Sequence, residues 1–428
     1  MIFCKKAGWG MALLFLCLIF GTGRTQKIEA AVQNVPESLE EESRLDTVGT
    51  DQETERAAVR EKKGQQEKEA GDTETDQAAA AQDELLAELD FDAIQQEVDS
   101  LLSSQQFSFA GTVRSLLQDG DPFRTFRAGN AVLSCAKTAF LAQKGLMKEL
   151  FLLVLAGAVL GSFSSLFEGK QVRDASFYMV YLLALALILK NFQSSGENLK
   201  AVITSLVAVM RILTPSYYLA AAAAGGASSA VMFYQMLLLV ILAVEKLLLA
   251  LVLPMIHIYL LIALVNDLSG EEILSHMTEL LETCVNGLLK SSLGVLVGMQ
   301  MIRNLIAPAL DSLRQMALWR TAGMIPGIGN AVNAVTELVA GSAVLIRNCF
   351  GVTAMLVLLA AGMVPAVQLL VSGLSFRLLA AAAQPVSDKR IAGCLAAAGK
   401  GYAMLLRLLL TVEVLFLLTI AILAGTFS

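Results

Sequence analysis

The 428-residue chain is poor in the residue patterns that build metal and disulfide sites. Its two histidines, His257 and His276, lie outside any HExxH motif, and neither stands beside a cysteine or aspartate at ligand spacing. The six cysteines are scattered along the chain without a CxxC pair. These absences argue against a zinc site and against a disulfide framework.

Nucleotide-binding motifs are also absent. The chain has no GxxxxGK[ST] loop, so a nucleotide-driven step would need a separate ATPase subunit. Residues 326–330 read PGIGN, which contains GxG but no further part of a dinucleotide fingerprint. We interpret this segment as a helix-breaking turn, because proline and glycine interrupt regular backbone geometry. The sequence therefore predicts no cofactor and no catalytic residue, since general acid–base catalysis needs paired groups that are not placed together here.

Charged residues make up only 16% of the chain, whereas 56% of it is hydrophobic, with a mean hydropathy of +0.63. Such a chain is too apolar for a soluble globular protein, and we expect a lipid bilayer as its solvent. Residues 29–99 hold 22 of the 38 acidic but only 6 of the 32 basic side chains, which leaves a basic remainder. Its lysines and arginines lie between apolar runs without interleaved aromatics, which is typical of a membrane surface and argues against a nucleic-acid partner.

The first residues have the layout of a secretory signal. Lys5 and Lys6 precede the apolar run 11–20, and small residues follow, so residues 1–30 are predicted to be a signal peptide or a signal anchor. Residues 31–82 are acidic and polar without an aromatic residue, and cannot bury enough apolar area to offset the entropy of ordering. We predict a disordered acidic linker on the extracytoplasmic side.

Residues 83–148 are predicted to form an amphipathic helical segment. Apolar residues recur at spacings of three to five from Leu85 to Leu102. Such a helix either docks on the membrane domain of its own chain or binds a partner. The basic residues between 124 and 148 oppose the positive-inside tendency if they lie outside, so this stretch either contains a short extra crossing or is interfacial.

Residues 149–428 are predicted to form a polytopic bundle of about five to eight transmembrane helices in an all-α protein. The run 230–265 is too long for one ordinary span and predicts two spans or one broken helix. Polar residues interrupt 270–320 regularly, which favours a membrane interface or a protein-lined cavity. The strong candidate spans are 150–167, 175–192, 230–250, 251–265, 351–374 and 402–423, and the weaker ones are 199–213, 293–307 and 331–345.

Two sets of residues inside the predicted spans are candidate sites. Glu245, Lys246 and Glu413 are costly in a membrane, so they either line a solute or proton path or form internal ion pairs and reach the interface. Gly294 and Gly298 form a GxxxG pair, which permits close helix packing within one subunit or between subunits. Four basic residues favour a cytoplasmic loop before the last span and an external tail: Lys389, Arg390, Lys400 and Arg407.

An ordered set of residues carries a family resemblance from about residue 194 to the C-terminus. It comprises the WRTA of 319–322, the IPGIG of 325–329, Glu337, Ser342, the RN of 347–348 with Gly351, Pro365, and the QP of 384–385. In this order the set resembles the stage III sporulation protein AE family of endospore-forming bacteria. The positions most like those of the family are Arg320, Pro326, Gly327, Gly329, Asn348 and Gly351.

The resemblance implies a polytopic component of the mother-cell complex that bridges the two membranes around the engulfed forespore. It implies partners among the membrane and intermembrane-space proteins of that channel complex, including a separate secretion-type ATPase, and no catalytic residue. Our leading hypothesis is a non-enzymatic subunit of this secretion-like complex, with a homo-oligomer as an open alternative. The second hypothesis is a permease subunit for a small solute, driven by a separate ATPase, whose path is lined by Glu245, Lys246 and Glu413.

Overall fold

The structure is a computed structural model, and it describes residues 91–101, 108–119, 128–164, 170–223, 228–269, 274–322, 329–385 and 387–425. All regular elements in these residues are helices. The predicted signal segment, 1–30, and the predicted acidic linker, 31–82, lie outside the described residues.

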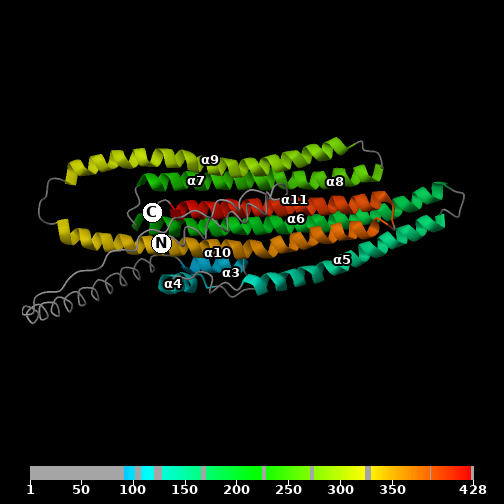
Figure 1. The fold of residues 1–428 in the computed structure, drawn as a ribbon, viewed down its shortest axis with the longest axis horizontal. Coiled ribbons are helices and arrows are strands. Elements are labelled where there is room, and N and C mark those ends of the chain that lie inside the picture. Colours follow the sequence, from blue (N-terminus) through cyan, green and yellow to red (C-terminus); the bar gives the residue numbers. More distant parts are fainter. Residues whose placement is uncertain are drawn as a thin grey trace, which may run out of the picture.

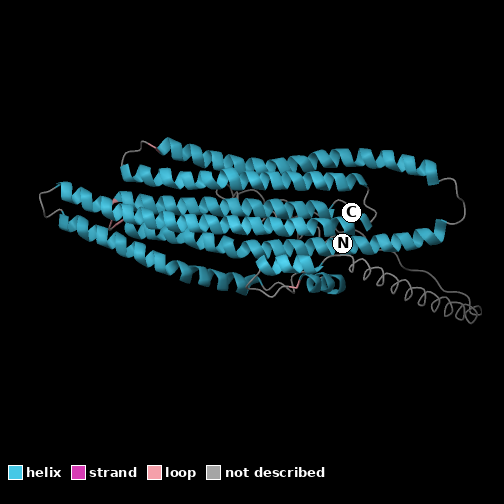
Figure 2. Cartoon of the chain, turned by 180° about the vertical axis from the view of Figure 1, so that it is seen from behind, coloured by secondary structure: helices cyan, strands magenta, loops and turns pink. Residues whose placement is uncertain are grey.

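Long helices lie side by side along one axis, and the chain runs back and forth between the two ends of the bundle (Figure 1). In chain order the elements are α3 (Phe91–Leu101), α4 (Phe109–Asp119), α5 (Ala128–Ser164), α6 (Lys170–Ala223), α7 (Ser228–Leu247), the π-helix η1 (Leu248–Val252), α8 (Leu253–Ser269), α9 (Ser275–Ala322), α10 (Gly329–Ala383) and α11 (Lys389–Gly425). The reverse view shows the same alignment of the helix axes (Figure 2).

Five of these helical segments are long and apolar enough to cross a membrane, the number at the lower limit of our prediction. The all-α, polytopic part of the predicted fold is thereby confirmed for the described residues. The longest helix, α10, has 55 residues. At about 1.5 Å per residue it is far longer than the ~30 Å hydrocarbon core of a bilayer. The five segments are Phe177–Leu213, Gln235–Ser269, Ser275–Ile302, Val344–Ala383 and Lys389–Ala421.

Several predicted spans merge into single helices. The segments 175–192 and 199–213 both belong to α6, and 331–345 and 351–374 both belong to α10. The polar residues between 190 and 200 lie inside α6, and side chains of neighbouring helices bond some of them, including Asn191. The prediction that α6 and α10 each contain two separate spans is therefore wrong.

The run 230–265 is one rod of α7, η1 and α8, so of the two predicted alternatives two spans is wrong, and the structure has a single helix with an irregular turn. Its irregularity is the π-turn at Leu248–Val252, where the Leu253 N–H donates to the Leu248 carbonyl. Pro254 follows directly, and its ring would crowd the carbonyl four residues back in a regular α-helix. The wider π-turn gives the proline room and keeps the rod unbroken.

The short N-terminal helices dock on the bundle. Helix α3 packs against α6, and α4 packs against α10. Ile94 and Val98 of α3 are buried, and the Phe109 ring lies 6.3 Å from that of Phe91 and 5.1 Å from that of Phe350 in α10. This result supports the interpretation of the amphipathic segment as a helix docked on its own chain. The predicted boundary between 148 and 149 falls inside α5.

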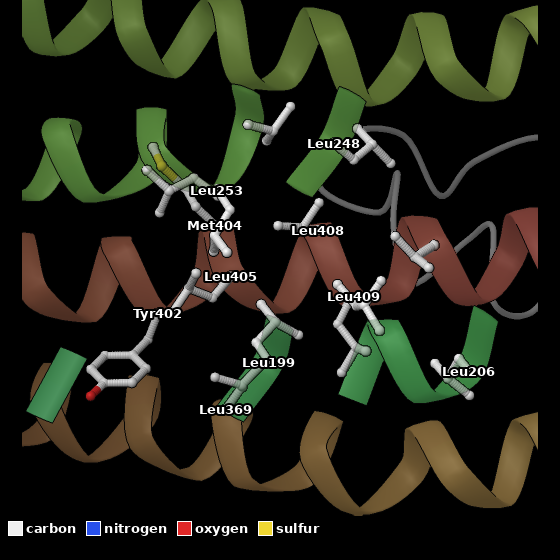
Figure 3. Close-up of a cluster of buried hydrophobic side chains, with 14 of the residues drawn as sticks. Leu199, Leu206, Leu248, Leu253, Leu369, Tyr402, Met404, Leu405, Leu408 and Leu409 are labelled. Atoms are coloured by element: carbon white, nitrogen blue, oxygen red, sulfur yellow. The ribbon is translucent and has the colours of Figure 1, made fainter. Parts of the chain in front are cut away.

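Helices α10 and α11 form the most extensive pair, and α5, α6 and α8 surround it. Figure 3 shows the interior beside α11. Leucines of α6, η1, α8 and α10 fill it together with those of α11 itself. Leu405, Leu408 and Leu409 are fully buried there. Because this packing is apolar and continuous, hydrophobic burial and dispersion hold the bundle centre together.

Candidate functional site: buried polar groups between the helices

The three charged residues predicted to line a path do not lie together. Glu245 on α7 is buried, whereas the neighbouring Lys246 is exposed on the outside of the bundle. The positive charge of Arg211 on α6 acts on the Glu245 carboxyl. Glu413 on α11 is 1% exposed, and neither Glu245 nor Arg211 acts on it electrostatically. The structure therefore divides the predicted set into a buried acid with a cationic neighbour, an exposed lysine and an isolated buried acid.

Glu413 faces the backbone of α10. A methyl group built on Gly362 would lie 2.5 Å from the Oε2 atom of Glu413. Both oxygens of this carboxyl are buried without a hydrogen-bond partner among the described residues. Buried polar groups without partners are rare in folded proteins, and such a group calls for an explanation.

The best satisfied polar cluster surrounds Tyr402 on α11. The Asn191 Nδ2 atom donates to the Tyr402 hydroxyl over 2.6 Å, and the Ser195 hydroxyl lies 3.3 Å from the same oxygen. The Tyr402 ring stacks on Phe376 of α10 and meets the edge of Phe192 of α6. The cluster joins three helices through one side chain.

His257 adjoins this cluster from α8. Its ring lies 5.2 Å from that of Phe192, and its Nδ1 atom is 2.8 Å from the Leu253 carbonyl oxygen of its own helix. A methyl group built on Gly196 would meet the imidazole at 2.6 Å, so α6 approaches α8 closely here. No cluster of three metal-ligating side chains exists among the described residues. The arrangement gives His257 a packing role between α6 and α8.

A second polar cluster lies where α8 ends and α11 begins. The Tyr181 hydroxyl of α6 donates to the Leu264 carbonyl over 2.6 Å. The Arg390 guanidinium lies 5.5 Å from the Phe177 ring centroid, and one of its nitrogens is 3.5 Å from the Leu268 carbonyl oxygen. These contacts fix the start of α11 against α6 and α8.

Helix α9 is attached to α11 by polar contacts. The Lys400 ammonium pairs with the Glu282 carboxylate at 2.5 Å, and an Arg407 nitrogen donates to the Asn286 side-chain oxygen over 3.1 Å. Glu282 and Asn286 are one helical turn apart on α9, and their partners Lys400 and Arg407 are about two turns apart on α11. The polar residues that interrupt 270–320 thus serve, in part, to hold α9 on the bundle.

Gly294 and Gly298 lie on a free surface of α9. A methyl group built on either residue meets no atom of the described chain within 4 Å, and the same holds for Gly287. The three glycines are spaced by seven and four residues, which places them on one helix face. Tight packing of Gly294 and Gly298 within the subunit is absent among the described residues, and packing between subunits stays a prediction.

The residues of the family-like set occupy α9 and α10. Arg320 belongs to the last turns of α9, Gly329 is the first residue of α10, and Asn348 and Gly351 follow in α10. Pro326 and Gly327, where we predicted a turn, lie outside the described residues.

The contacts around Tyr402, Arg390 and Glu282 escaped sequence reasoning. Their partners are separated by more than one hundred residues in the chain, as with the 211 residues between Asn191 and Tyr402. Lys400 and Arg407 stood out only as charges near a predicted loop. The signal available in the sequence was a polar residue isolated in an apolar run. Such a residue can be identified as a candidate for a buried contact, but its partner cannot.

The fold and these polar contacts define a multi-pass helical membrane protein whose buried polar groups bind helices to one another. The sequence profile described as Stage III sporulation protein AE matches residues 107–426, so the chain belongs to the stage III sporulation protein AE family. The match begins well before residue 194, where the resemblance in the sequence begins. The chain is 22% identical to the Stage III sporulation protein AE of Bacillus subtilis (strain 168) over 291 residues, covering 67% of this chain and 73% of that protein. No solved structure matches it significantly.

Proposed function

We propose that this protein is a non-enzymatic membrane subunit of the channel complex that joins the mother cell to the forespore during sporulation. It resides in the mother-cell membrane around the forespore and supports late forespore development. Membership of the stage III sporulation protein AE family carries this proposal. Its partners are other membrane and intermembrane-space proteins of the complex, including a separate secretion-type ATPase, because the chain has no P-loop of its own.

The filled interior supports a platform over a stand-alone permease. The centre beside α11 is filled mainly by leucine and other apolar side chains (Figure 3), and the hydroxyls of the buried Thr353, Thr411 and Thr419 donate to carbonyls of their own helices. Glu245 and Glu413 do not act on each other, and Lys246 is exposed. A conduit in this family therefore forms between subunits, and the polar contacts inside one subunit hold its helices in place.

The course of the helices supports an orientation in the membrane. Helix α5 makes one pass along the bundle in addition to the five apolar segments, and with α7 and α8 as one rod the total is even, so both flanks lie at one end (Figure 1). We place this end outside the cytoplasm, together with the acidic linker, and the turn at Asp388 inside. Lys389 and Arg390 then follow the positive-inside tendency. A cysteine at Gln96 should react with an impermeant reagent in intact cells, and one at Asp388 only after lysis; the reverse pattern contradicts this orientation.

Deletion of the gene tests the function. The deletion strain should arrest after engulfment with poor late forespore transcription, and a wild-type copy at another locus should restore spore yield. Normal spore yield in the deletion strain contradicts the proposal. Purification of the chain from sporulating cells should recover the separate ATPase, and recovery should persist when the ATPase carries an inactive nucleotide site.

The permease alternative makes a different prediction. Neutralising Glu245, Lys246 and Glu413 individually to glutamine should abolish solute movement if these residues line a path. Normal sporulation and assembly in all three variants remove the support for that path.

A further inference from the structure

Glu413 is a carboxyl group in the membrane part of the protein without any partner that stabilises its charge. It lies in Lys389–Ala421, a segment apolar enough to span a membrane, and it is 1% exposed. Neither oxygen has a hydrogen-bond donor among the described residues. An ionised carboxylate in such a place is so costly that the group takes up a proton instead.

Among the described residues, the neighbouring helices supply no charge that compensates Glu413. Helix α10 carries no charged side chain between residues 348 and 376. On α6 and α7, Arg211 and Glu245 act on each other, and neither acts on Glu413. On α9, Glu282 pairs with Lys400. The ionisable groups of α8, His257 and Asp267, do not act on Glu413 either.

Helix α10 contains a hydrogen-bond acceptor without its usual donor in the region that Glu413 contacts. The Glu413 carboxyl packs on Gly362, where a methyl group would push the carboxyl aside. Pro365 lies inside the same helix and has no N–H, so the carbonyl of Ala361 loses its usual donor four residues later. Ala361 is buried and directly precedes Gly362 in the chain. The Glu413 carboxyl thus packs on the residue that follows a carbonyl without its usual donor.

We propose that Glu413 is a proton-binding site between α10 and α11, and that its protonation state controls the contact between these two helices. In the closed arrangement the carboxyl is protonated and packs on Gly362, and the acceptor that we propose for its proton is the Ala361 carbonyl, which precedes Gly362. Release transfers that proton from the Glu413 oxygen to a water molecule and leaves a carboxylate. The carboxylate repels the carbonyl oxygen and draws water, so α10 and α11 separate near Pro365, where the missing hydrogen bond makes α10 easiest to bend.

Infrared spectroscopy of the purified full-length protein in lipid nanodiscs tests the protonated state. The wild type minus Glu413→Gln difference spectrum should show the carbonyl stretch of one protonated carboxylic acid near neutral pH, because the other carboxyl groups contribute equally to both proteins. Glu282→Gln is the matched control and should leave this band in place, because Glu282 is partly exposed and pairs with Lys400. Absence of the band from the wild type minus Glu413→Gln difference spectrum of the folded proteins overturns the proposal.

Thiol labelling tests the control of the helix contact. Leu409 is fully buried one turn before Glu413 on the same face of α11, so a cysteine there reports opening. In a background without the native cysteines, labelling of Leu409→Cys, divided by that of an exposed cysteine at the same pH, should increase about tenfold per pH unit as the single proton is released. The same reporter combined with Glu413→Gln should give a low ratio that does not depend on pH. Equal pH dependence in the two proteins overturns the proposal.

The same labelling experiment distinguishes a proton from a small cation. If the carboxylate and the freed carbonyl bind sodium instead, labelling in the wild type depends on sodium concentration at constant pH. A sodium dependence of this kind contradicts the proton site. These measurements use the purified protein, so their outcome is independent of whether the chain acts in the sporulation complex.

Discussion

The contact between α10 and α11 and the outer face of α9 both contain glycines, but the glycines have opposite surroundings. A methyl group built on Gly399 of α11 would lie 3.2 Å from the Gly373 carbonyl oxygen of α10 and 2.8 Å from a side-chain carbon of Arg377. One built on Gly294 of α9 meets nothing within 4 Å in the described chain. The first glycine lets two backbones approach, whereas the second has no neighbour within the subunit.

This difference shows that a small-residue motif does not reveal its own role. GxxxG at 294 and 298 was the motif that stood out in the sequence, but the close approach occurs at glycines outside it. The outer face of α9 instead presents exposed apolar side chains around its glycines: Val295, Val297, Met301, Ile302 and Leu305. In a bilayer, such a face is open to lipid or to another helix.

The largest expected effect is at Gly399. Gly399→Ala should lower the free energy of unfolding by about 1–3 kcal/mol, because the added methyl group overpacks the contact between α10 and α11. Reversible unfolding in detergent, followed by circular dichroism, measures it. An unchanged free energy of unfolding would show that the two backbones separate without cost.

Tyr402→Phe should have the next largest effect. It removes the hydroxyl that accepts from Asn191 and costs about 1 kcal/mol in the same unfolding assay. Tyr178→Phe is the control, since Tyr178 is exposed and its hydroxyl lies outside this cluster. Equal effects of the two substitutions contradict a stabilising role for the Tyr402 cluster.

Lys400→Gln should lower the free energy of unfolding by less than Tyr402→Phe does. The pair with Glu282 is partly exposed, and such pairs contribute about 0.2–1 kcal/mol. Lys246→Gln, at an exposed position on α7, should change the free energy of unfolding by less than this. If α9 is held mainly by the polar contacts, proteolysis of α9 should also be faster in Lys400→Gln than in Lys246→Gln.

An effect of opposite sign is expected at Gly294. Gly294→Ala should raise the free energy of unfolding by roughly 0.5–1 kcal/mol, because alanine favours a helix and meets no atom there. A decrease like that at Gly399 would show that the α9 face is packed within the subunit.

The assembly prediction for α9 needs larger side chains. Leucine at Gly294 and Gly298 should break the complex while the isolated subunit stays folded, if this face meets another subunit. Crosslinking in membranes and sizing in detergent measure the assembly. An unchanged size of the complex would show that these glycines face lipid and not another subunit.

Some properties of the molecule are encoded locally and were predictable. Hydropathy identified the membrane segments, and the period of Ile94 and Val98 identified an amphipathic helix, because both depend on neighbours a few residues away. The division into spans was less predictable. Polar residues near Asn191 lie inside α6, and the sequence does not show that Tyr402 lies opposite.

By itself, the sequence determined that the chain is helical, apolar and built for a membrane, and an ordered set of residues indicated its family. Only the tertiary structure decided that α7 and α8 form one rod, that α3 and α4 dock on the bundle, and that Glu413 faces Gly362 while Lys246 faces outward. The reason is physical. Hydropathy and helix period are properties of a segment, whereas the partner of a buried polar group is set by which distant helix packs against it.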